Sequence, residues 1–198
     1  MISVDIILAS TSRIRCNILG NAGVKFSVID SELDETAAKN SLPGLSADNL
    51  AQELAMQKSQ KVSSKHPNAL VIGADQVLGF KGRMFNKPSS GADAKDQLTL
   101  LRNETHTLFS AVSCAISGKE VWKHCSAASL TMRNFTMEFL DLYLNADPDH
   151  YMSSVGAYKL EETGIQFFEK IEGDYFTILG LPILPLLKFL REREIIQL

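Results

Sequence analysis

The 198-residue sequence predicts an α/β fold in which helices flank a mixed β-sheet. Short apolar runs alternate with helix-like stretches through the first half of the chain, a pattern typical of strands linked by helices. Two longer strand-like stretches follow one another in the second half. No repeat, low-complexity segment or long linker interrupts the sequence. We therefore expect a single domain over residues 1–198, built either as one body or as two small lobes that share a cleft.

The elements of the first half follow from apolar runs and breakers. A buried strand is predicted over residues 4–8, where β-branched and other apolar residues follow one another. Small hydroxyl residues come next and can cap a helix over about 13–20. A second strand is expected at 26–29. Residues 36–47 are expected to form a loop, because Pro43-Gly44 is a strong breaker.

Helices and strands continue to alternate after this loop. Ser46 is expected to cap a helix over about 48–64, and a buried strand follows at 70–74. Lys81-Gly82 is then expected to join the two strands of a hairpin, 77–80 and 83–85. The remaining elements are a helix from the turn at 87–91 to about residue 102, strands at 105–116 and 121–133, helices at about 136–145 and 149–153, and an amphipathic helix at 183–196.

Composition and charge exclude several classes of protein. Basic and acidic residues number 20 and 23 and are dispersed, so the strongly basic balance of a nucleic-acid-binding protein is missing. The apolar stretches are far shorter than the ~20 residues that span a bilayer, and no secretory signal is recognisable. Cys16, Cys114 and Cys125 are odd in number and unrelated in spacing, which disfavours a disulfide framework or a zinc site. We expect a cytoplasmic protein without a membrane or nucleic-acid partner.

Polar residues gather where the buried strands are expected to end, which is where open α/β sheets bind ligands. Ser10-Thr11-Ser12 with Arg15 could seat an anion at a helix start, although a capped helix with a solvated arginine explains the same residues. Asp75, after the strand 70–74, could hold Mg²⁺ or orient water, or could simply begin a turn. Taken alone, Lys58 and Lys87 could simply be solvated, and Asp34-Glu35 could be part of an ordinary polar loop.

Electrostatics favours taking these residues together. Two carboxylates about 4 Å apart repel by ~4 kcal/mol at an effective dielectric constant of 20, so a shared site needs cations. Arginine, lysine and a divalent metal would supply them, and such a mixture suits a polyphosphate. The motifs of Walker-type NTPases, dinucleotide-binding folds, zinc proteases and α/β-hydrolases are missing from the sequence.

The same residues carry a family resemblance that covers about residues 4–191. The motifs that recur in the family's order are Leu8-Ala9-Ser10-Thr11-Ser12 with Arg15, Asp34-Glu35, Leu54-Ala55 with Lys58, Gly73-Ala74-Asp75-Gln76-Val77, Lys87-Pro88, Gly156-Ala157-Tyr158, Glu172-Gly173-Asp174-Tyr175 and Gly180-Leu181-Pro182. Each motif is weak alone, but their joint occurrence is specific. The chain resembles the Maf (septum-formation-like) nucleotide pyrophosphatases.

This resemblance implies an architecture related to the inosine-triphosphate pyrophosphatases, with an elongated mixed sheet and two lobes around a deep cleft. It implies hydrolysis of a nucleoside triphosphate to the monophosphate and pyrophosphate, a need for Mg²⁺ or Mn²⁺, and often a homodimer. Carried over residue by residue, it makes Asp75, Glu35, Lys58 and Lys87 catalytic, Asp75 and Glu35 metal-binding, and Ser10, Ser12, Arg15 and Gln76 substrate-binding. Arg13-Ile14 departs from the family's usual residues in the phosphate loop.

One position bears on the choice of base. Glu161 stands where the pyrimidine-triphosphate branch usually carries glutamine. A carboxylate only accepts hydrogen bonds, and guanine offers adjacent N–H donors, so Glu161 looks similar to the 7-methyl-GTP branch and is a candidate substrate-binding residue. Glu162, where glycine is common, departs from that branch, and a surface pair of glutamates is the alternative.

Two other functions stay open beside 7-methyl-GTP hydrolysis. One is a dTTP/UTP pyrophosphatase of the same family, and the other is a non-catalytic nucleotide-binding regulator of cell division. The four charged residues Glu35, Lys58, Asp75 and Lys87 favour an enzyme over the regulator, because binding a polyanion alone would not need carboxylates.

Overall fold

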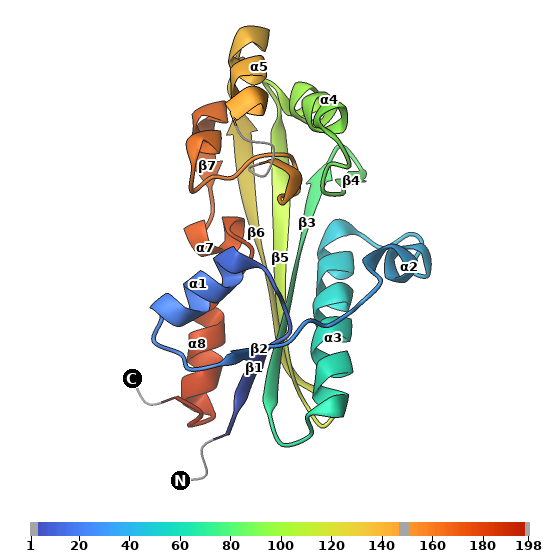
Figure 1. Cartoon of the computed structure of the whole chain (residues 1–198), viewed down its shortest axis with the longest axis vertical. Coiled ribbons are helices and arrows are strands. Elements are labelled where there is room, and N and C mark those ends of the chain that lie inside the picture. The colour runs from blue at the N-terminus through green and yellow to red at the C-terminus, as the bar shows by residue number, and fades with distance from the viewer. Residues whose placement is uncertain (1–3, 147–150, 197–198) are drawn as a thin grey trace. The chain divides into compact units, whose positions relative to one another are not determined.

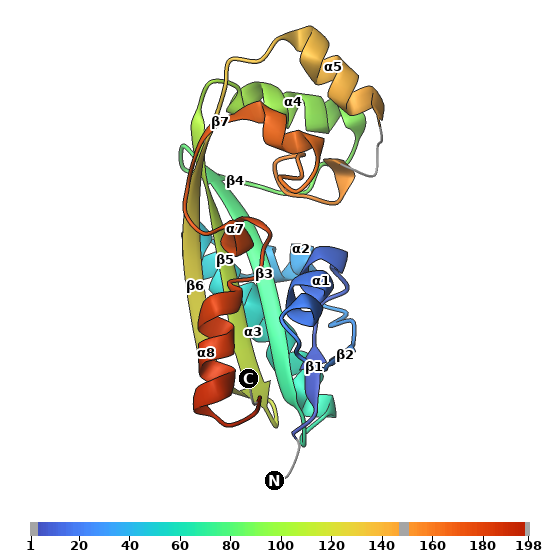
Figure 2. The ribbon, with the colours of Figure 1, turned by 90° about the vertical axis from the view of Figure 1, so that its left-hand side faces the viewer.

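The computed structural model describes residues 4–146 and 151–196. These fall into two compact units: the first comprises Met1–Gln76, Ser110–Ser126 and Tyr175–Leu198, and the second comprises Val77–Phe109 and Ala127–Asp174. Of the helix predicted at 149–153, residues 149 and 150 lie outside the described residues, whereas residues 151 and 152 are helical. The ribbon is drawn in two orientations in Figures 1 and 2.

The strands of the described residues form one mixed sheet, as predicted. Their order is β2-β1-β3-β5-β6-β7, with β4 paired to β3. β1 is parallel to both β2 and β3, whereas the β3/β4 and β6/β7 pairs are antiparallel. The strands are β1 Ile6–Leu8, β2 Ser27–Val28, β3 Leu70–Phe80, β4 Arg83–Phe85, β5 Thr105–Ile116, β6 Lys119–Met132 and β7 Phe168–Glu172.

Most of the helices begin where the sequence predicts. The helices are α1 Arg13–Asn21, α2 Glu35–Asn40, α3 Ala47–Lys65, α4 Gly91–Leu101, α5 Met137–Ala146, the 3₁₀-helix η1 Thr163–Phe167, α7 Tyr175–Ile178 and α8 Ile183–Glu192. Ser12, Ser46 and Ser90 occupy the N-cap positions of α1, α3 and α4. The last helix ends at Glu192, earlier than predicted, and β7, η1 and α7 were not predicted.

The first unit has three layers, with helices on both faces of the sheet. Alternate residues of β1 and β3 point to opposite faces, as the strand period of two requires. Leu8 and Ile72 join the core under α1 and α8, whereas Ile7 and Val71 pack with Val62 of α3. Figures 1 and 2 show α3 on one face of the sheet and α1 and α8 on the other.

The segment predicted as a loop at 36–47 is helical at its start, so that prediction was wrong there. Asp34 caps α2 by accepting a hydrogen bond from the backbone N of Ala37 at 2.9 Å. Glu35 lies in the first turn, where a carboxylate is favoured by the helix dipole. The cap and the two alanines that follow decide the local structure, and Pro43-Gly44 lies after the helix has ended.

The strand predicted at 70–74 continues without interruption to Phe80 as β3. Asp75 therefore lies in the middle of a strand and not at its end, where the sequence placed it. Polar side chains are tolerated at this point because each has a partner inside the first unit. Asp75 pairs with Lys58 on one face of β3, and Gln76 bonds the segment at 177–178 on the other.

The second unit has an aromatic core. The ring of Phe167 packs edge-on against Phe135, Phe139 and Tyr143, with ring centroids 4.7–5.1 Å apart. His106 of β5 is also buried in this unit, and its Nε2 lies 2.7 Å from the hydroxyl of Tyr158. Burial lowers the pKa of His106 to about 4.

The buried histidine makes stability depend on pH. Its folded pKa of about 4 lies below its ordinary value of 6.5, so the unfolded chain binds one more proton between these values. The free energy of unfolding is expected to fall as the pH drops from about 6.5 toward 4, by up to ~1.4 kcal/mol per pH unit for this group.

Urea unfolding of the wild type and His106→Phe measures this effect. The stability advantage of the wild type over the variant is expected to shrink by ~1–2 kcal/mol between about pH 7 and pH 5. Loss of the Tyr158 hydrogen bond adds an offset that does not change with pH in this range, so it cancels from the comparison. A stability difference that is constant with pH would contradict a neutral buried His106.

Candidate functional site

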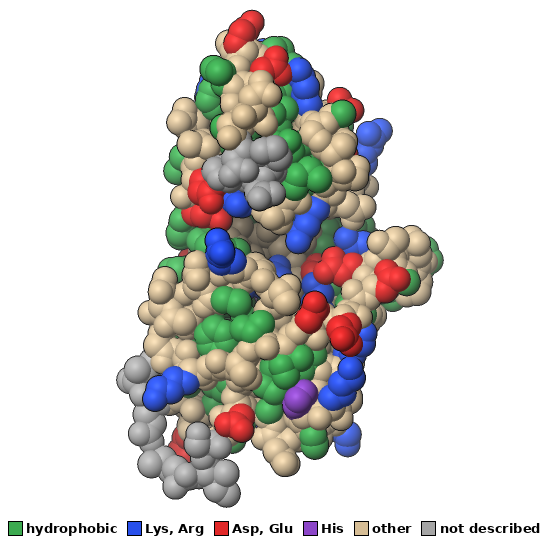
Figure 3. All heavy atoms as spheres, in the orientation of Figure 1, with side chains coloured by type: hydrophobic (Ala, Val, Ile, Leu, Met, Phe, Trp, Pro, Cys, Tyr) green, Lys and Arg blue, Asp and Glu red, His purple; other side chains and the backbone are tan. Residues whose placement is uncertain are grey.

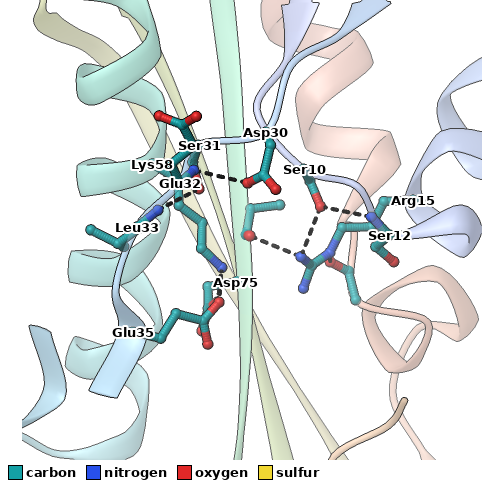
Figure 4. Close-up of polar contacts among 12 residues, drawn as sticks. Ser10, Ser12, Arg15, Asp30, Ser31, Glu32, Leu33, Glu35, Lys58 and Asp75 are labelled. Carbon is teal, nitrogen blue, oxygen red and sulfur yellow. Dashed lines mark hydrogen bonds and ion pairs between the residues drawn. The ribbon is translucent and has the colours of Figure 1, made fainter. Parts of the chain in front are cut away.

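Three charged side chains meet on the α3 face of β3. The Nζ atom of Lys58 lies 2.6 Å from Oδ1 of Asp75 and 2.7 Å from Oε1 of Glu35. The side chains of Lys58 and Asp75 are each 8% exposed, whereas that of Glu35 is 44% exposed. Figure 4 shows the lysine from α3 reaching Asp75 beside Glu35 at the start of α2. We call Glu35, Lys58 and Asp75 the ion triad.

A glycine brings the strand and helix close enough for this contact. A Cβ atom on Gly73 would lie 2.2 Å from the carbonyl oxygen of Ala55 and 2.6 Å from the backbone N of Ser59. Asp75 is two residues further along β3 and therefore on the same face. Lys58 neighbours Ser59 in α3, so the close approach at Gly73 sets the distance between Lys58 and Asp75.

Gly73→Ala is expected to destabilise the protein and to damage the ion triad. The new methyl group would meet backbone atoms, so β3 and α3 must move apart, at a cost of ~1–3 kcal/mol or more. Urea unfolding and turnover check this expectation. Gly20→Ala is a matched control, because a Cβ there would meet only a ring carbon of Phe26 at 3.9 Å. A variant with wild-type stability and turnover would contradict this role of Gly73.

The loop before α2 decides which of the two adjacent carboxylates reaches Lys58. The loop begins with a local turn, in which Oδ1 of Asp30 accepts a hydrogen bond from the backbone N of Glu32 at 2.8 Å. The Lys61 ammonium also donates to the carbonyl of Glu32, which ties the loop to α3. Because Asp34 is used as the cap of α2, Glu35 is the carboxylate that joins the ion triad.

Arg15 lies on the opposite side of β3, at the start of α1. Its Nη1 donates to the carbonyl of Ala74 at 2.9 Å and to Oγ of Ser10 at 3.3 Å, and its Nε donates to the carbonyl of Gly180 at 2.9 Å. Ser10 also accepts a hydrogen bond from the backbone N of Ser12 at 3.3 Å. Burial lowers the pKa of Arg15, while the charges of Asp75 and Glu35 act in the opposite direction. Guanidinium groups nevertheless stay protonated in proteins.

Gln76 fixes the segment that leads into α8. Its amide Nε2 lies within 2.9–3.1 Å of Oγ of Ser110 and the carbonyl oxygens of Thr177 and Ile178. The Ser110 hydroxyl donates to the same Thr177 carbonyl at 2.6 Å. Sequence reasoning missed Ser110 and Thr177 altogether, because isolated hydroxyl residues in a strand and a short helix carry no local signal.

The first unit thus brings together seven of the nine predicted site residues. The group comprises Ser10, Ser12, Arg15, Glu35, Lys58, Asp75 and Gln76. Lys87 and Glu161 belong to the second unit, and their roles stay predictions. On the face drawn in Figure 3, acidic and basic side chains are interspersed and do not form one basic patch.

The donor set of the ion triad is compatible with a hard divalent cation. Mg²⁺ is usually held by one or two carboxylates together with substrate phosphates and water, and Glu35 and Asp75 are two such carboxylates. In residues 4–146 and 151–196, no group of three or more His, Cys, Asp or Glu side chains is arranged to hold a metal ion without a substrate. None of the helices in these residues is long and apolar enough to cross a membrane.

Comparison with known proteins identifies the family. The model of a family described as Maf-like protein matches residues 5–193. The chain is 48% identical over 187 residues to the nucleoside triphosphate pyrophosphatase of Paramagnetospirillum magneticum, covering 93% of this chain and 96% of that protein. It is 45% identical over 197 residues to the 7-methyl-GTP pyrophosphatase of Brucella abortus, covering 98% and 99%.

Two further comparisons are of different strength. The 7-methyl-GTP pyrophosphatase of Rhizobium johnstonii is 48% identical over 189 residues, covering 94% of this chain and 95% of that protein. Among solved structures, the Ham1 protein of Staphylococcus aureus gives a TM-score of 0.44 at 17% identity, covering 66% of this chain and 72% of that chain. The match of the family model and the near-complete coverage of the relatives show that the chain belongs to the Maf-like protein family.

Proposed function

We propose that the protein hydrolyses the α–β phosphoanhydride of a nucleoside triphosphate, releasing the monophosphate and pyrophosphate. The observation that carries this proposal is the ion triad, in which one buried ammonium lies between two carboxylates. Carboxylates that face a polyanion are costly for binding alone, but they are useful for activating water and for holding a cation. Relatives named nucleoside triphosphate pyrophosphatase, 43% and 48% identical to this chain, support the same activity.

The carboxylates and the ammonium of the ion triad have different roles in this reaction. Attack by water forms an oxygen bond to the α-phosphorus and breaks its bond to the bridging oxygen, whose electron pair leaves with pyrophosphate. A carboxylate of Asp75 or Glu35 accepts the proton from the water. The Lys58 ammonium stabilises the negative charge that builds on the phosphates in the transition state. From the second unit, Lys87 is proposed to neutralise further charge on the triphosphate.

A divalent metal ion, Mg²⁺ or Mn²⁺, is proposed as the cofactor. Glu35 and Asp75 are the residues that would hold it, together with phosphate oxygens of the substrate. When bound, the ion supplies positive charge that polarises the phosphoryl oxygens and neutralises the leaving group. Without the ion, the two carboxylates would repel the triphosphate, so removal of divalent metal by a chelator is expected to abolish turnover.

We further propose 7-methyl-GTP as the preferred substrate. Glu161 offers a hydrogen-bond acceptor, which suits the N1–H and N2–H donors of guanine, and its negative charge suits a base made cationic by methylation. Relatives from Brucella abortus and Rhizobium johnstonii that carry the name 7-methyl-GTP pyrophosphatase support this choice. Pyrimidine triphosphates are the competing substrates, because glutamine, which both donates and accepts, is usual at this position in the branch that takes them.

A substrate screen tests both levels of the proposal. Pyrophosphate release is measured with Mg²⁺ on 7-methyl-GTP, GTP, dTTP, UTP and the other common triphosphates. The highest kcat/KM is expected on 7-methyl-GTP, and a preference for dTTP or UTP would overturn the choice of base while leaving the reaction intact. No pyrophosphate from any triphosphate would overturn the proposed reaction itself.

The variant Glu161→Gln tests whether Glu161 selects the base. The variant is expected to lose at least ~10-fold in kcat/KM on 7-methyl-GTP relative to the pyrimidine triphosphates, the scale of one polar contact to a base. Glu169→Gln, which alters an exposed glutamate of β7 in the same unit, is the matched control. An unchanged preference in Glu161→Gln would remove this residue from the base site.

A further inference from the structure

We propose that Arg15 and Gln76 are positioning residues, which hold Asp75 in place from the opposite face of β3, and that they are not ligands of the substrate. This inference rests on the proposed function. Its starting point is that Asp75 lies between two residues, Ala74 and Gln76, that are both tied to the turn at 177–180, one through Arg15 and one directly.

Arg15 replaces a missing strand at the edge of β3. β1 runs parallel to β3, and its last paired residue is Leu8, opposite Ile72. The backbone N of Ala9 then donates to the carbonyl of Ile72 at 2.7 Å. The next carbonyl on that edge belongs to Ala74, because ladder carbonyls of a strand recur at every second residue. The chain has turned into α1 by then, and Nη1 of Arg15 supplies the donor at 2.9 Å. The guanidinium thus continues the hydrogen-bond ladder up to the residue before Asp75.

The same guanidinium is held in place by the turn at 177–180. Nε of Arg15 donates to the carbonyl of Gly180 at 2.9 Å. Gly180 has φ of +92°, and a Cβ there would lie 3.4 Å from Nη2 of Arg15 and 3.7 Å from the side-chain amide carbon of Gln76. The turn therefore packs directly on both side chains. Nε and Nη1, at different places on the rigid planar guanidinium, donate to the carbonyls of Gly180 and Ala74. The single nitrogen of a lysine could not make both hydrogen bonds with this geometry.

Gln76 ties the other neighbour of Asp75 to the same turn. Its Nε2 lies 3.1 Å from the carbonyl of Thr177 and 2.9 Å from that of Ile178. These hydrogen bonds are partly buried and join segments about a hundred residues apart in the chain, and they lie on the face of β3 that is opposite Lys58. Because the residues on both sides of Asp75 are held in this way, the backbone of Asp75 is fixed in the position from which its carboxylate contacts Lys58.

A charge-conserving variant separates positioning from phosphate binding. If Arg15 holds Asp75 in place, Arg15→Lys and Arg15→Met lose kcat about equally, by at least ~10-fold, because neither bridges Ala74 and Gly180. The Kd of an α,β-methylene triphosphate analogue is expected to stay within ~3-fold of the wild-type value, since no ligand contact is lost. If Arg15 binds phosphate, Arg15→Lys keeps most of its kcat and Arg15→Met weakens the analogue by ~10-fold or more, which would overturn the proposal.

Gln76→Glu provides the second, independent variant. It keeps the shape of the side chain but removes the donor and places a carboxylate against two carbonyls. The kcat losses of Arg15→Lys and Gln76→Glu are expected to be less than multiplicative in the double variant, because each frees the same strand segment. Fully multiplicative losses would overturn a shared positioning role. Arg191→Lys, on the exposed side of α8, is the control for a conservative change in the same unit.

The outcomes also separate this inference from the proposed function. A wild type that hydrolyses triphosphates, with an Arg15→Lys variant that keeps its kcat, refutes the positioning role and leaves the function standing. A wild type that hydrolyses none refutes the function and the inference with it. If Arg15→Met does not fold, Arg15→Lys and Gln76→Glu still decide the question through kcat and analogue Kd.

Discussion

Replacing Lys58 by methionine is expected to reduce turnover by at least ~10²-fold, the scale of one lost transition-state contact. Methionine keeps much of the length of the lysine side chain but removes its charge. Asp75, whose side chain is 8% exposed, then loses its buried counter-ion and faces Glu35 without a cation. Breaking a buried ion pair in this way costs ~3–5 kcal/mol, and the exposure of Glu35 places the expected loss near the lower end.

Steady-state kinetics and urea unfolding measure the two effects of this substitution. Lys65→Met is the matched control, because Lys65 lies on the same helix and forms an ion pair with Glu32 in which both side chains are at least 65% exposed. Exposed pairs contribute ~0–1 kcal/mol, so the control should be close to the wild type. If Lys58→Met kept normal turnover, the ion triad could not be the reaction centre.

Asp75→Asn is expected to reduce turnover by at least ~10²-fold while changing the shape of the side chain very little. The amide neither accepts a proton from water nor binds a divalent cation strongly. Lys58 retains its contact with Glu35 at 2.7 Å, so the loss of stability should be smaller than in Lys58→Met. The kinetic loss is expected in kcat, measured as pyrophosphate released at saturating substrate.

The exposed Asp5, just before β1, supplies the control variant Asp5→Asn. A metal titration of Asp75→Asn adds a second readout, because weaker metal binding should raise the Mg²⁺ concentration needed for half-maximal turnover. Near-normal kcat in Asp75→Asn would show that this carboxylate neither activates water nor holds the cation.

Local patterns in the sequence account for most of the fold. The buried runs at β1 and β3, the serines that precede α1, α3 and α4, and the hairpin turn at Lys81-Gly82 are strong signals within short windows. These local signals do not predict the structure correctly where tertiary contacts determine whether an element continues or ends. Asp75 predicts the end of a strand, because a charged residue is rare inside one. The ion pair with Lys58 explains why β3 continues past it.

The candidate site was predictable as a set of residues but not as an arrangement. The motifs that carry the resemblance named the ion triad, although nothing in the sequence places Glu35 and Asp75 on one ammonium. The Gly73 contact with α3 and the bonds of Arg15 to Ala74 and Gly180 join segments far apart in the chain. No local propensity encodes such contacts. The sequence therefore does not distinguish an arginine that bonds backbone carbonyls from an arginine that binds phosphate.

The structure of the protein with Mg²⁺ and the α,β-methylene analogue of 7-methyl-GTP tests the central claim most directly. Hydrolysis is blocked in this analogue, so the geometry before the reaction can be observed. We expect the α- and β-phosphates to lie beside Lys58 and the metal ion to be bound by Asp75 or Glu35. A well-ordered analogue whose phosphates contact none of these three residues would contradict the account.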